Sequence, residues 1–160
     1  MTIRSASSET HIIDHGAEPG VLRLWLRLLT CTTLIENQVS SRLRNEFDIT
    51  LPRFDLMAQL ARFPDGLLMS ELSQRMMVSG GNITGITDNL ERDGLVERVM
   101  QPKDRRAKKV RLTAKGRDTF EQMAVVHATW IDEWLGDLTA QEQQQIYILL
   151  GKIKQHVGND

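Results

Sequence analysis

The sequence of 160 residues predicts a mainly α-helical fold with one small β ribbon. Apolar residues recur at helical spacing through most of the chain, and only residues 95–100 and 108–112 have the composition of strands. The net charge of −1 conceals one strongly basic segment around this ribbon. The hydrophobic content of 41% is typical of a globular protein with one domain or two closely joined lobes.

The N-terminal half begins with a segment that has no sustained periodicity, residues 1–19, which we expect to be a flexible arm. Residues 21–47 contain neither Pro nor Gly and predict one long helix. The first half of this helix is apolar almost all round, so we expect it to be covered by a partner subunit. A second helix should start around Pro52 and end at the Pro-Asp-Gly sequence of residues 64–66.

The centre of the chain predicts a helix-turn-helix followed by the ribbon. Ser70 can cap a short helix, the Ser-Gly-Gly sequence of residues 79–81 breaks it, and a further helix ends at Gly94. Two final helices follow the ribbon. Thr113 opens the first of them, and a capping box from Thr139 to Glu142 opens the second.

A helix-turn-helix joined to a basic ribbon is typical of a DNA-binding unit with a wing. Residues 98–117 contain nine basic residues against the single acid Asp104. The second short helix would enter the major groove, its glycines would allow close approach to a phosphate, and the ribbon tip would reach the minor groove. A solvated helix face is the alternative for each polar position. The DNA-binding candidates are Ser79, Gly80, Gly81, Asn82, Thr84 and Thr87 on the helix, and Lys103, Asp104, Arg105, Arg106 and Lys108 on the ribbon.

At these residues the sequence resembles the MarR family of bacterial transcriptional regulators. The resemblance lies in residues 79–98 and in residues 102–113, and it extends over about residues 20–157. Its most specific part is the Asp-Arg-Arg wing followed by the Leu-Thr-x-x-Gly pattern of residues 112–116.

The resemblance implies a homodimer with a winged helix-turn-helix lobe at residues 51–112 and a helical dimerisation region formed by residues 20–50 and 113–157. It also implies that Arg106 enters the minor groove, with Asp104 and Arg105 bracing the wing or meeting phosphate. The partner would be a double-stranded, pseudo-palindromic operator with half-sites about 34 Å apart. Regulation would be repression, or activation where the operator position favours it. Many members carry Arg after the Thr of the recognition helix, where this chain has Gly85, so their operator preference does not carry over.

Family members commonly bind a small anion, often aromatic, and the resemblance implies such a ligand here. Arg23 and Arg27 lie one turn apart on an apolar helix, so they need either a ligand anion or a salt bridge across the subunit interface to Asp132, Glu133 or Asp137. Residues 22–32 and 51–57 resemble the MarR regulators found beside aromatic-acid degradation genes, some of which respond to aryl-CoA thioesters. The ligand-binding candidates are Arg23, Trp25, Arg27, Arg42, Arg44, Arg53, Met57, His127 and Trp130.

Cys31 suggests a rival mechanism, because some family members sense peroxide through a cysteine in the first helix. Such a sensor uses tyrosines close to the cysteine, whereas the one tyrosine of this chain is the distant Tyr147. We therefore expect Cys31 to be buried and inert.

Other function classes find little support. One cysteine excludes an internal disulfide, and His11, His15, His127 and His156 do not form a convincing zinc site. No catalytic arrangement, signal peptide or membrane span is present, so we expect a cytoplasmic protein that is not an enzyme and needs no cofactor. A winged-helix domain accessory to an enzyme would need a catalytic domain after Asp160. A winged helix used only for protein contacts would not need the basic wing.

Overall fold

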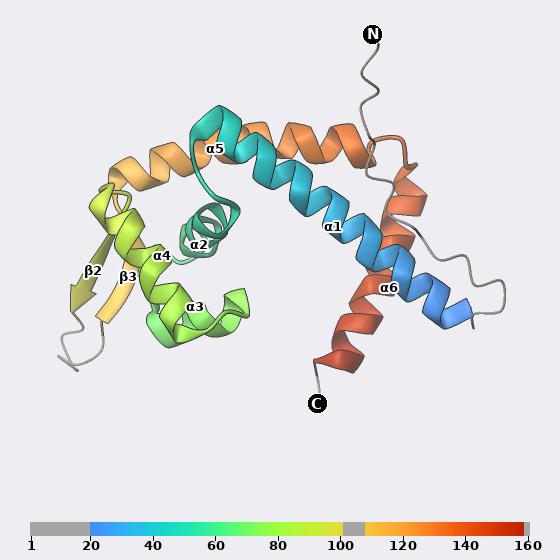
Figure 1. Cartoon of the computed structure of the whole chain (residues 1–160), viewed down its shortest axis with the longest axis horizontal. Helices are drawn as coiled ribbons and strands as arrows, with labels where there is room; N and C mark the ends of the chain where they lie inside the picture. Colours follow the sequence, from blue (N-terminus) through green and yellow to red (C-terminus); the bar gives the residue numbers. More distant parts are fainter. Residues whose placement is uncertain (1–19, 101–107, 159–160) are drawn as a thin grey trace, which may run out of the picture. The chain divides into compact units, whose positions relative to one another are not determined.

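The computed structural model describes residues 20–100 and 108–158, and the helices and strands follow the predicted order (Figure 1). One two-residue strand, β1, was not predicted. The elements are α1 (Gly20–Phe47), α2 (Leu51–Ala61), β1 (Leu67–Leu68), α3 (Met69–Met76), α4 (Gly80–Arg92), β2 (Val96–Met100), β3 (Lys108–Leu112), α5 (Ala114–Leu135) and α6 (Ala140–Val157).

The chain divides into two compact parts, residues 1–37 and residues 38–160. The described portion of the first part is the beginning of α1, residues 20–37, in which no side chain is buried. Its apolar residues are largely exposed, Trp25 by 55% and Leu34 by 60%. The long apolar helix expected from the sequence is therefore present, and among the described residues its first half keeps its apolar side chains largely exposed.

The core of the second part lies where α2, α3 and α4 pack with the small sheet (Figure 1). Side chains one helical turn apart bury together, as Leu56 and Leu60 do on α2. Leu72, Ile83 and Leu90 from the other two helices are also fully buried. Each such side chain contributes about 1.5–3 kcal/mol when it leaves water, so this core fixes how α4 is presented.

The sheet is antiparallel with the strand order β1-β3-β2. The register of β2 and β3 runs from Val96 opposite Leu112 to Met100 opposite Lys108, so the two strands form the predicted ribbon. Strand β1 adds to the other edge of β3, where Leu67 lies opposite Val110.

Three helix starts show how well local signals predict boundaries. Pro52 lies in the first turn of α2, and the Thr139–Glu142 capping box begins α6, both as predicted. Two hydrogen bonds from Thr139, through its hydroxyl and its backbone N–H, lower the pKa of Glu142. The prediction that Ser70 caps α3 is wrong. The helix already starts at Met69, and the N–H of Leu68 donates to the Glu71 carboxylate at 2.7 Å.

The start of α5 is packed directly on the backbone that leads into β2. Thr113 caps the helix by accepting from the N–H of Gly116 at 2.9 Å, and its hydroxyl donates to the carbonyl of Gly94 at 2.7 Å. A Cβ on Gly116 would lie 1.8 Å from the carbonyl oxygen of Leu95. This close approach explains why the Leu-Thr-x-x-Gly pattern ends in glycine.

Candidate nucleic-acid interface

The turn between α3 and α4 presents the first half of α4 to solvent. The hydroxyl of Ser73 donates to the carbonyl of Val78 at 2.6 Å, and Met77 takes a left-handed conformation with φ of 54°. Ser79 then caps α4 by accepting from the N–H of Asn82 at 3.4 Å, a role that the sequence did not predict. Gly80, Gly81, Asn82 and Thr84 are all exposed, so these DNA-binding candidates form one accessible surface.

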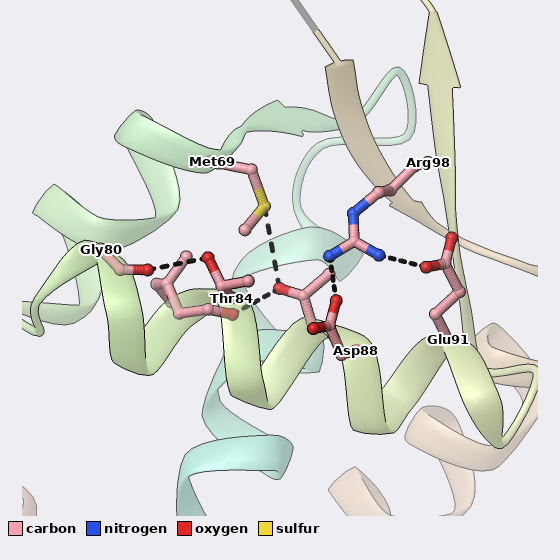
Figure 2. A network of polar contacts seen from close by, with 8 residues as sticks. Met69, Gly80, Thr84, Asp88, Glu91 and Arg98 are labelled. Carbon is pink, nitrogen blue, oxygen red and sulfur yellow. Dashed lines mark hydrogen bonds and ion pairs between the residues drawn. The ribbon is translucent and has the colours of Figure 1, made fainter.

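Two threonines on α4 differ in whether their hydroxyl groups could contact DNA; the hydrogen bonds of this region are drawn in Figure 2. The hydroxyl of Thr84 donates to the carbonyl of Gly80 at 2.9 Å, which leaves only its oxygen lone pairs free. Thr87 is fully buried, donates to the carbonyl of Ile83 at 2.7 Å and lies against the sulfur of Met69. The interpretation of Thr87 as a base-contacting residue is therefore wrong. Its position four residues after Ile83, on the apolar face of the helix, is the signal that could have shown this.

The second half of α4 is tied to β2 by Arg98, whose guanidinium forms ion pairs with both Asp88 and Glu91 (Figure 2). Burial would lower the pKa of Arg98, but the hydrogen bonds and charges of Asp88 and Glu91 outweigh burial and raise it. The side chain of Arg98 is only 20% exposed, so these pairs hold the helix to the strand more firmly than a pair on the open surface. This positioning role of Arg98 does not follow from the sequence, in which Arg98 counts only as one of the basic residues of the segment.

The free positive charge of the basic segment is smaller than its composition suggests. Arg98 is neutralised as described, and Arg111 pairs with Glu97 on the neighbouring strand at 2.7 Å. Lys115 donates to the carbonyl of Asp93 at 2.9 Å and forms no ion pair with a described residue. Lys108 is exposed and forms no ion pair among the described residues. The predicted wing-tip residues Lys103, Asp104, Arg105 and Arg106 lie outside the described residues.

Two ligand-binding candidates, His127 and Trp130, lie in a cluster of aromatic rings on α1, α2 and α5. His127 lies 5.1 Å from Phe54 and 6.1 Å from Trp130, measured between ring centroids. Phe47 lies 6.3 Å from Trp130, and Phe120 lies 5.5 Å from Phe54. Burial lowers the pKa of His127, so the structure favours its neutral form. We call these five residues the aromatic cluster.

Arg42 borders the aromatic cluster and is already paired. Its guanidinium lies 5.6 Å from the centroid of Trp130 and 5.1 Å from that of Trp134, and it bonds Glu133 at 2.7 Å. Glu133 is one of the three acids expected to pair with Arg23 or Arg27 across the subunit interface, and within the single chain it pairs with Arg42.

The remaining ligand-binding candidates are dispersed. Met57 is fully buried in the core, and Arg53 forms an ion pair with Asp93. The other candidates, Arg23, Trp25, Arg27 and Arg44, are exposed on α1.

Cys31 is exposed, so the expectation of a buried thiol is wrong for the single chain. Among the described residues, no group of three His, Cys, Asp or Glu side chains is placed to hold a metal ion. Within the same ranges, no helix is long and apolar enough to cross a membrane.

Comparisons with known proteins agree with this arrangement. A profile described as MarR family matches residues 47–107. The chain is 32% identical to a MarR family transcriptional regulator from Silicibacter pomeroyi, with a TM-score of 0.71 over 86% of this chain and 94% of that one. It is 27% identical to a MarR mutant from E. coli complexed with operator DNA, with a TM-score of 0.72 over 83% and 94% of the two chains. An uncharacterized HTH-type transcriptional regulator from Bacillus cereus is 28% identical over 134 residues, which are 83% of this chain and 88% of that protein.

Proposed function

Because the chain belongs to the MarR family of transcriptional regulators, we propose that it is a homodimeric repressor released from a palindromic operator by a small anionic aromatic ligand or its CoA thioester. As a MarR-type protein it is a DNA-binding transcriptional regulator and not an enzyme. The observation that carries the DNA-binding mode is the exposed first half of α4, held beside the β2–β3 ribbon by Arg98.

A homodimer is supported by two helices that expose apolar side chains. The stretch of α1 from residue 20 to residue 37 buries none of its side chains, and neither does any residue of α6. Exposed apolar surface on this scale is typical of an interface between subunits. A twofold dimer would bind half-sites about 34 Å apart. The exposed residues are Val21, Leu22, Leu24, Trp25, Leu26, Leu29 and Leu34 on α1, and Ile146, Tyr147, Ile148, Leu149, Leu150, Ile153 and Val157 on α6.

The wing is tested by replacing Arg106, the proposed minor-groove residue. Arg106→Ala should weaken binding to the duplex upstream of the protein's own gene by at least about tenfold, because it removes a cation from the narrow groove. Arg44→Ala, which removes an exposed arginine from α1, is the matched control and should bind as the wild type does. Both variants should keep the helical circular dichroism and the oligomeric state. Unchanged DNA affinity of a folded Arg106→Ala dimer would contradict the wing assignment.

The aromatic cluster and Arg42 support the proposed effector. A flat aromatic ring would pack against the half-buried His127, beside the buried Trp130, and its carboxylate or thioester phosphates would replace Glu133 as the partner of Arg42. Release requires only that the ligand bind one arrangement of the dimer more tightly than the other. The test is to titrate the protein–DNA complex with benzoate and with benzoyl-CoA, using wild type and Arg42→Ala. If ligand releases the wild type from DNA but not Arg42→Ala, the assignment is supported. If ligand releases the two proteins equally, the assignment is contradicted.

The exposure of Cys31 favours a second candidate, a redox-sensing regulator. Loss of DNA binding on treatment with peroxide, prevented by Cys31→Ser, would select this mechanism over the ligand-responsive one.

A further inference from the structure

We infer that Asn82 is the residue by which α4 reads base identity, and that each operator half-site presents an adenine to it. The inference rests on the proposed insertion of α4 into the major groove. It adds the identity of the reading residue and the chemistry of the base that this residue recognises.

The polar side chains of α4 are almost all engaged within the protein. Asp88 and Glu91 are paired with Arg98, and Thr84 and Thr87 donate to backbone carbonyls (Figure 2). The remaining polar pair, Asn89 and Arg92, is joined by a hydrogen bond of 3.0 Å. Along α4, all of which the structure describes, Asn82 is the one polar side chain without a hydrogen bond or an ion pair.

The backbone of Asn82 is fixed in the helix, whereas its side chain is exposed and without a partner in the described residues. Its backbone N–H donates to the hydroxyl of the helix cap Ser79, which fixes the residue in the first turn of α4. Its side chain is exposed. In a helix-turn-helix, the N-terminal residues of the second helix are those that meet base edges. Asn82 therefore lies where base edges are contacted, and its carboxamide is available to form hydrogen bonds with them.

The glycines around Asn82 allow its short side chain to reach the bases. Gly81 and Gly85 lie one turn apart on the same exposed face of α4. A Cβ on either glycine would meet no atom within 4 Å, so the space beside the backbone is open. Without bulky side chains there, the helix can approach the floor of the groove closely.

The chemistry of the carboxamide selects adenine. Its oxygen accepts and its nitrogen donates side by side, which matches the N6 donor and the N7 acceptor of adenine in the major groove. Guanine presents two acceptors at the same edge, so it can accept a hydrogen bond from the amide nitrogen but offers no donor to the amide oxygen. The paired bonds should favour adenine by about 5- to 150-fold over a base that cannot form both.

The test uses duplexes selected from a random library by the full-length wild-type protein. Each adenine that selection enriches is then replaced by 7-deazaadenine, which removes the N7 acceptor and keeps base pairing. Wild type should lose affinity, within the range above, at one adenine of each half-site. Asn82→Ala should bind the natural duplex at least as weakly as the wild type binds the modified one, and it should lose nothing further on the modified duplex. Asn89→Ala, a matched change at the other end of α4, should respond as wild type does.

Three results would overturn the inference. Asn82→Ala could remain as sensitive to 7-deazaadenine as the wild type, which would assign the readout to another residue. It could also weaken binding equally on all duplexes, which would indicate a phosphate contact. A wild type that enriches no sequence would refute the proposed function itself and the inference with it. Because the side chain of Asn82 has no hydrogen-bonding partner in the described part of the chain, the variant should keep the thermal midpoint of the wild type, which confirms that it folds.

Discussion

The contact between Gly116 and Leu95 gives the sharpest prediction for stability. Replacing Gly116 with Ala adds a Cβ at 1.8 Å from the carbonyl oxygen of Leu95 and 2.8 Å from its carbonyl carbon. Ordinary carbon–oxygen contacts are about 3.3 Å or longer, so the two backbones must separate by about 1.5 Å. Neither atom belongs to a flexible side chain, and the strain therefore falls on the junction between α5 and β2.

The expected loss can be assembled from the contacts at this junction. The same carbonyl of Leu95 accepts from the backbone N–H of Thr113 at 3.1 Å and from its hydroxyl at 3.3 Å. Overpacking costs about 1–3 kcal/mol, and each disturbed hydrogen bond about 0.5–1.5 kcal/mol. The greater helix propensity of Ala offsets this loss of stability by up to about 1 kcal/mol. We expect Gly116→Ala to lower the free energy of unfolding by about 3 kcal/mol.

Urea unfolding followed by circular dichroism, at one fixed protein concentration, measures this difference. Gly85→Ala is the matched control, because a Cβ on Gly85 meets no atom within 4 Å. The greater helix propensity of Ala should there raise the free energy of unfolding by up to about 1 kcal/mol. The two alanine variants should therefore shift stability in opposite directions. Equal unfolding free energies for the two variants would refute the argument from the close approach of Leu95.

Two further predictions concern the paired charges on α4 and the half-buried histidine. Arg98→Gln should lower the free energy of unfolding by about 1–2 kcal/mol and weaken DNA binding, because Asp88 and Glu91 then repel phosphate. Adding Asp88→Asn and Glu91→Gln should restore DNA affinity, and failure to do so would exclude repulsion as the cause. Because burial lowers the pKa of His127 from 6.5, the stability that this residue contributes above pH 6.5 should be lost as the pH falls below that value. His127→Phe should flatten this dependence of the thermal midpoint on pH, whereas a change at the exposed His156 should not.

The sequence predicts most element boundaries because their signals are local. Pro52, Thr113 and Thr139 each mark a helix start through the backbone geometry or the capping bond of one turn. Strand β1 escapes prediction because Leu67 and Leu68 have too few neighbours to show alternation. Its existence depends on pairing with β3, which lies about forty residues later in the chain.

The candidate site is predicted less completely, because its side chains are shared with partners that composition does not show. Arg98 and Arg111 add to the count of the basic segment, yet acids on α4 and β2 neutralise both. Arg53 is a plausible anion ligand until the fold places Asp93 beside it. Such pairings arise from packing, so a charge count over a segment gives an upper bound on the charge available to DNA.

These pairings imply that affinity and base preference come from different elements. On α4, the acids Asp88 and Glu91 are already balanced by Arg98, so the helix brings little net charge to DNA. The ribbon should therefore provide most of the counterion release on binding. Since the slope of log K against log salt concentration is about −0.9 per neutralised phosphate, Arg106→Ala should reduce the magnitude of this salt slope by about 2 in a dimer, which loses two such contacts. Asn82→Ala should leave that slope unchanged while removing base discrimination, and a reduced slope would instead place Asn82 on a phosphate.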